Sequence, residues 1–117
     1  MQLKEEVLGK SYELSVAFVG AEEARAVTWA AKHKDKASNV LSFPLSKTSG
    51  EIVLCPETAR EQCADHYMDS RTFLAYLYIH GLFHLKGLDH GDTMEREERR
   101  IMHRFGLSAH EQNRHRN

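Results

Sequence analysis

Three histidines lie close together in the stretch HGLFHLKGLDH, which spans residues 80–90. His80 and His84 are four residues apart, so on a helix both imidazoles leave the same face, one turn apart. Gly87 lets the chain leave the helix, and His90 can then return as a third nitrogen donor. Three nitrogen donors leave the fourth tetrahedral position open, which is typical of catalytic rather than structural zinc sites. The spacing therefore predicts a metal site.

A histidine pair at this spacing also occurs in helices whose core merely tolerates two hydrogen-bonded imidazoles. The third histidine after a glycine turn favours the metal site. Zinc proteases carry a glutamate directly after the first ligand as general base, and this chain has Gly81 there. The protease interpretation therefore loses most of its support. Asp89 could orient a ligand imidazole as an outer carboxylate, or it could be an ordinary turn residue.

The whole-chain composition is that of one ordinary domain. The chain has 117 residues, a formal net charge of −1 and only 2 cysteines. The near-neutral charge argues against a broad electrostatic surface for nucleic acids, and no apolar run is long enough to span a membrane. We therefore expect a single cytoplasmic domain over residues 1–117, without membrane or DNA binding. Residues 108–117 are expected to form a frayed polar tail.

The pattern of apolar residues predicts the elements that position the histidines. Alternating and β-branched residues predict strands, prolines and glycines end them, and helical spacing predicts helices. The fold class that we expect is α+β, with a small mixed β-sheet packed against several helices and a long central helix carrying the metal-binding histidines. The expected elements are strands 12–19, 38–44 and 51–56, helices 20–34, 56–66, 70–86 and 92–105, and a loop at 45–50.

Three blocks of the chain resemble one known family. The histidine stretch resembles the H-G-x-x-H-L-x-G-Y-D-H signature of the YbeY family. Two upstream blocks resemble its R-x-K-D-x-P-T-D/N-V-L-S-F-P and G-D-I segments, and they read KHKDKASNVLSFP (32–44) and GEIVLCPETAREQ (50–62). The resemblance covers roughly residues 20–106.

The resemblance implies a function as well as a fold. YbeY proteins are bacterial metal-dependent endoribonucleases and ribosomal RNA maturation factors. The resemblance thus implies a single-strand-specific endoribonuclease that processes the 3′ end of 16S rRNA and serves ribosome quality control. Its partners would be precursor small-subunit rRNA and the ribosome or ribosomal proteins. His80, His84 and His90 would hold zinc, or another divalent metal such as Ni²⁺, with His84 also in the catalytic set.

The chain departs from the family pattern at several positions. Lys32 stands where the family has an arginine that is thought to bind the RNA phosphate, so the charge is kept but the planar fork is lost. Arg60 is the other candidate cation. Leu88 replaces the tyrosine of the signature. The family also carries another strand and helix before residue 12, where this chain has a short stretch.

Two residues of the second block and two other functions stay open. Asn39 and Ser42 could shape the cleft, although Ser42 could equally be a strand residue with an ordinary backbone hydrogen bond. The same histidines would also suit a metal-dependent hydrolase of another substrate. In a third interpretation the protein is a non-catalytic ribosome-assembly factor whose metal is structural.

Overall fold

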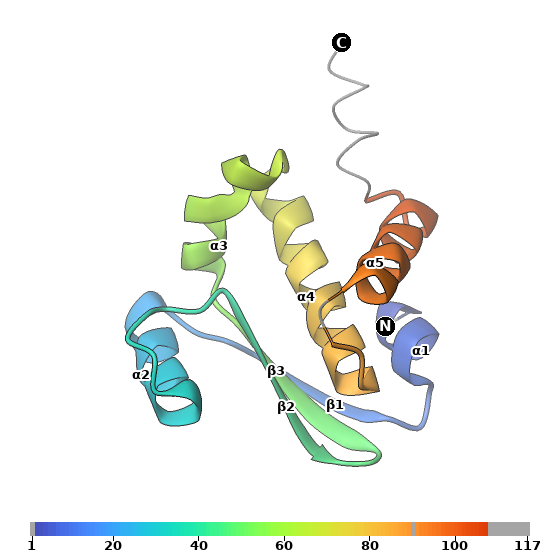
Figure 1. The fold of residues 1–117 in the computed structure, drawn as a ribbon, viewed down its shortest axis with the longest axis horizontal. Coiled ribbons are helices and arrows are strands. Elements are labelled where there is room, and N and C mark those ends of the chain that lie inside the picture. Colours follow the sequence, from blue (N-terminus) through green and yellow to red (C-terminus); the bar gives the residue numbers. More distant parts are fainter. Residues whose placement is uncertain (1, 90, 108–117) are drawn as a thin grey trace.

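The expected α+β class is confirmed. The computed structural model describes residues 2–89 and 91–107, so the predicted tail at 108–117 lies outside the described residues. Within the described ranges, five α-helices accompany a three-stranded mixed sheet (Figure 1). None of these helices has the length and hydropathy needed to cross a membrane. The elements are α1 (Gln2–Leu8), β1 (Glu13–Phe18), α2 (Ala21–Lys32), β2 (Val40–Ser46), β3 (Ser49–Leu54), α3 (Pro56–Gln62), the 3₁₀ turn η1 (Cys63–His66), α4 (Ser70–Lys86) and α5 (Asp92–Arg104).

The sheet has the order β1-β3-β2, with β1 parallel and β2 antiparallel to β3. The turn or loop expected at 45–50 is shorter in the structure, because β2 continues to Ser46 and a tight turn at residues 47–48 leads directly into β3. Pro44 does not end the strand, since β2 is an edge strand and a proline there need not donate a ladder hydrogen bond. The pairing register shifts between Pro44 and Ser46.

Two helix starts differ from the prediction. The first residues form α1, which no pattern predicted, and its Val7 is buried against the core. Asp92 with Glu95 three residues later has the spacing of a capping box. Instead Gly91 occupies the cap with φ 152°, and Asp92 is the first helical residue. Both acidic residues still lie in the first turn, where their negative charges interact favourably with the positive end of the helix dipole.

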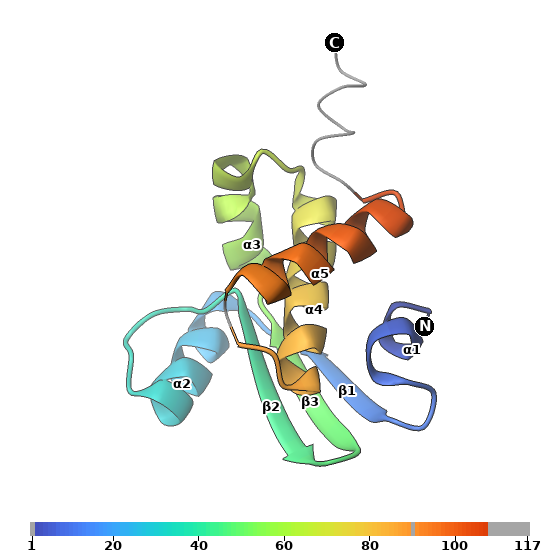
Figure 2. The same cartoon turned by 45° about the vertical axis from the view of Figure 1, so that its right-hand side comes forward.

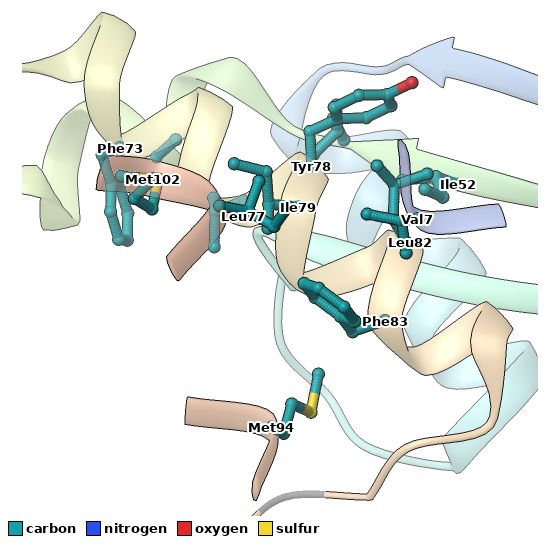
Figure 3. Packing of buried hydrophobic residues seen from close by; sticks show 13 residues of the cluster. Val7, Ile52, Phe73, Leu77, Tyr78, Ile79, Leu82, Phe83, Met94 and Met102 are labelled. Atoms are coloured by element: carbon teal, nitrogen blue, oxygen red, sulfur yellow. The ribbon is translucent and has the colours of Figure 1, made fainter. Parts of the chain in front are cut away.

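Helix α4 is the central element, as predicted. It contacts β2 and β3 on one side and α1 and α5 on another (Figures 1 and 2). Asp69 caps it by accepting a hydrogen bond from the Thr72 backbone N–H at 2.7 Å, and Gly87 ends it with φ 106°. Its buried side chains pack against Ile52 of β3, Val7 of α1 and two methionines of α5 (Figure 3). These side chains are Phe73, Leu77, Tyr78, Ile79, Leu82 and Phe83.

At Gly81, α4 packs closely against the sheet. A Cβ placed on it would lie 3.0 Å from Ser42 Oγ and 3.1 Å from Ile52 Cδ1. We expect Gly81→Val to lower the free energy of unfolding by about 1–3 kcal/mol, because the added methyl groups overpack this contact. Urea denaturation measures the change.

Gly20→Ala is the matched control. Gly20 has φ −80°, and a Cβ there would meet no described atom within 4 Å, so Gly20→Ala causes no overpacking. Gly20 is the N-cap of α2, where alanine is less favourable than glycine, so a loss of no more than about 1 kcal/mol is expected. Wild-type stability of Gly81→Val would contradict the close packing of α4 on the sheet.

Candidate functional site

His80 and His84 face each other on the surface of α4 that looks toward β2. Their ring centroids are 4.6 Å apart with planes at 87°, and the two Nε2 atoms are 3.1 Å apart. The predicted placement on one helix face is thus what the structure has. It arises from the i, i+4 spacing within an uninterrupted α4.

A buried carboxylate from α5 holds the first histidine. Glu98 is only 4% exposed, and its Oε2 lies 2.5 Å from His80 Nδ1. A carboxylate accepts, so Nδ1 carries the proton, and the lone pair of a neutral ring is then on Nε2, toward His84. Asp89 was considered either as an outer carboxylate or as an ordinary turn residue. It is exposed, and none of the hydrogen bonds found among the described residues joins it to either histidine.

Tyr76 adds a second contact to the same carboxylate. Its hydroxyl lies 3.5 Å from Glu98 Oε1. Burial and then the charge of Glu98 raise the pKa of Tyr76 to about 12, so the phenol keeps its proton and donates. Sequence reasoning missed both residues. For Glu98 the sequence did hold a signal, because an acidic residue four positions after Met94 and three before Ile101 lies on the apolar face of α5.

The donor set suits a tetrahedral ion. Two nitrogen ligands of one zinc ion, each about 2.0–2.1 Å from the metal, lie about 3.3 Å apart. The 3.1 Å between the Nε2 atoms of His80 and His84 is close to that value. His90 lies outside the described residues, and the described ranges alone contain no group of three potential ligands. The three-histidine site therefore stays a prediction.

A cleft of about 530 Å³ opens in front of the two histidines. Lys32, at the end of α2, lines the same cleft, and Figure 2 shows α2 beside the β2 edge of the sheet. Lys36 adds a second cation, whereas Arg60 is not among the described lining residues. The structure thus brings together the predicted cation and two of the three predicted ligands. Other lining residues come from the segment before β2, from β2 itself and from Gln62 of α3.

Asn39 and Ser42 both line this cleft. Asn39 Nδ2 donates to Gln62 Oε1 at 2.7 Å, which fixes the amide at the cleft wall. Ser42 Oγ donates to the Gly81 carbonyl at 3.2 Å, so this hydroxyl ties β2 to α4 directly between the histidines. Ser42 therefore supports α4 through a hydrogen bond to its backbone while also forming part of the wall.

A family model described as "Endoribonuclease YbeY" matches residues 1–108. Curated proteins of that name are similar to the chain: 34% identical in Finegoldia magna over 80% of this chain, 32% in Halorhodospira halophila over 87%, and 30% in Staphylococcus carnosus over 90%. The matches cover 66%, 76% and 80% of those relatives, respectively. The solution structure of TM1509 from Thermotoga maritima is similar in fold, with a TM-score of 0.63 and 24% identity over 85% of this chain and 71% of that one.

Proposed function

The chain belongs to the YbeY endoribonuclease family, and on this premise we propose that it is a metal-dependent endoribonuclease acting on single-stranded RNA. One observation carries the proposal. A single cleft is lined by two histidines with facing Nε2 atoms and by the cation Lys32. Metal ligands beside a cation suit hydrolysis of a phosphodiester, since a metal ion and a cation both stabilise the negative charge that develops on the phosphoryl oxygens.

In this proposal His80, His84 and His90 hold a zinc ion or another late divalent metal such as Ni²⁺. When bound, the ion supplies Lewis acidity and lowers the pKa of a coordinated water toward neutrality. Glu98 keeps the proton of His80 on Nδ1 and so keeps Nε2 ready as a donor. Lys32 contributes positive charge to the phosphate that enters the cleft.

The proposed substrate rests on the family and on the few positive charges that line the cleft. With a net charge of −1, RNA capture rests on the local cations of the cleft, Lys32 and Lys36, and on a protein partner. We propose that the chain matures the 3′ end of 16S rRNA and takes part in ribosome quality control in the cytoplasm. The RNA is then a precursor of the small-subunit rRNA, and the partner is the ribosome or one of its proteins.

The direct test is cleavage of a precursor 16S rRNA 3′ fragment by purified protein of measured zinc content. We expect cleavage within single-stranded segments, and no cleavage of the same segment in a duplex or as DNA. Zinc-replete protein that cuts neither naked RNA nor RNA in ribosomes would overturn the nuclease. Ribosome association in that case would support the assembly factor with a structural metal.

Replacing Lys32 by alanine is expected to lower kcat/KM for RNA cleavage about 10- to 100-fold, because it removes a charge from the phosphate site. Zinc content should stay unchanged, since Lys32 is not a ligand. Lys32→Arg should retain or raise the activity, because the guanidinium restores the two-donor fork that matches phosphate.

Lys34→Ala is the matched control for this substitution. Lys34 is exposed, carries the same charge two residues away, and is absent from the described lining of the cleft. Its cleavage rate should equal that of the wild type. Equal losses in both variants would indicate general charge attraction, and full activity of Lys32→Ala would make Lys32 an ordinary surface lysine.

A further inference from the structure

A second, smaller pocket lies beside the histidine cleft. Its volume is about 170 Å³, and it shares three lining residues with the cleft, namely Asn39, Val40 and His80. The remaining lining residues are His66, Phe73, Tyr76 and Leu77. The two spaces are therefore neighbours, separated only by side chains that belong to both.

One wall of this pocket consists of aromatic rings in nearly parallel planes. His66, from η1, stacks on Phe73 with ring centroids 4.6 Å apart and planes at 24°. Phe73 in turn lies 6.0 Å from Tyr76 at 18°. Phe73 is fully buried, whereas His66 is exposed and Tyr76 half-buried. His66 and Tyr76 also lie near each other, with ring centroids 6.4 Å apart, so the three rings form a cluster in which His66 and Tyr76 are open to solvent and Phe73 is not.

The described lining has no fixed positive charge for a phosphate and suits a flat, uncharged group. Among its described lining residues there is no lysine, arginine or carboxylate, in contrast to the neighbouring cleft with Lys32 and Lys36. The volume lies below the roughly 300–1,000 Å³ that is typical of pockets for drug-sized ligands. Aromatic and imidazole rings stack bases of single-stranded RNA, and an asparagine amide can hydrogen-bond a base edge. The Asn39 amide at the shared wall is already fixed by Gln62.

We propose that this pocket binds one unpaired nucleobase of the RNA while the adjacent phosphate lies in the histidine cleft. The inference rests on the proposed nuclease function and deepens it, because it assigns a base subsite next to the cleaved bond. The base must be unstacked from its neighbours to enter the pocket. A paired strand cannot present it without losing a base pair, so the subsite selects single strands by geometry rather than by charge.

The test combines three variants with an abasic substrate. His66→Ala should raise KM for a short single-stranded RNA about tenfold, since the base loses a ring on which it stacks, and kcat and zinc content should be unchanged. His66→Phe should stay near the wild type because the ring is kept. Tyr67→Ala is the control, since Tyr67 is exposed and outside the described lining. An RNA with one abasic position beside the cleavage site should raise the KM of the wild type about as much as His66→Ala does with intact RNA. In His66→Ala the abasic position should cause no further rise in KM.

Two outcomes would overturn the subsite. One is an unchanged KM in His66→Ala, and the other is an abasic penalty equally large in His66→Ala and the wild type. If the wild-type protein cuts no RNA, the proposed function fails, and fluorescence anisotropy with the intact and the abasic RNA then decides the subsite separately. Tighter binding of the intact RNA that depends on the His66 ring would support it, and equal binding of both RNAs would overturn it.

Discussion

Replacing His84 by alanine is expected to abolish stoichiometric zinc binding and to reduce RNA cleavage more than 100-fold. Losing an outer partner of a metal ligand typically costs about 10- to 100-fold in metal affinity or activity, so losing a ligand itself should cost more. In the structure His84 supplies one of two facing Nε2 atoms, 3.1 Å from that of His80. Zinc is measured by inductively coupled plasma mass spectrometry on dialysed protein, and cleavage on the 16S rRNA fragment.

The matched control for this substitution is His33→Asn. His33 is an exposed imidazole with φ 56°, a conformation that asparagine also tolerates, and it is not among the described residues of the cleft. It should keep one zinc per chain and full activity. A full equivalent of zinc in His84→Ala would disprove the three-ligand site. Loss of zinc without loss of cleavage would show that the metal does not serve the reaction.

The elements with a strong periodic pattern were predictable from sequence, and those that depend on neighbours were not. Helix α4 has an aspartate cap, a glycine stop and apolar residues on most sides, so local signals agree along its whole length. The strand was predicted to end at Pro44, but β2 continues past it because it lies at the sheet edge. An edge position is a property of the sheet and cannot be read from the local sequence. Helix α1 is short, and the burial of Val7 against the core gives it stability that no local pattern reveals.

In the site, too, local features were predictable from the sequence and contacts between distant elements were not. The pairing of His80 with His84 is local, since it needs only a continuous helix. The approach of Lys32 to them was expected from the family resemblance, and physically it depends on how α2 lies beside β2. Glu98 is eighteen residues from His80, on another helix, so only the packing of α5 on α4 brings the two together. Asp89 was considered because it neighbours His90 in sequence, and since His90 lies outside the described residues that possibility stays open.

The second large effect is expected at Glu98. Glu98→Gln should lower zinc affinity about 10- to 100-fold, because the neutral amide binds the His80 Nδ1–H more weakly than a carboxylate does and so holds the ring less firmly. The substitution is nearly isosteric and keeps a carbonyl acceptor, so the fold should persist and the loss should appear in metal affinity. Competition with a zinc chelator measures the dissociation constant, and circular dichroism monitors the fold.

Glu97→Gln separates this role from a general effect of charge on α5. Glu97 is the neighbouring residue, makes the same charge change, and pairs with Arg100 at 3.0 Å on the surface rather than with a histidine. Such exposed pairs contribute about 0–1 kcal/mol, so neither zinc affinity nor stability should shift much. If Glu98→Gln and Glu97→Gln both bind zinc as tightly as the wild type, Glu98 is buried for packing alone. A loss of zinc affinity in Glu98→Gln but not in Glu97→Gln would identify the carboxylate of Glu98 as the group that orients His80. Glu98→Asp keeps the carboxylate and should restore the affinity if the shorter side chain still reaches Nδ1.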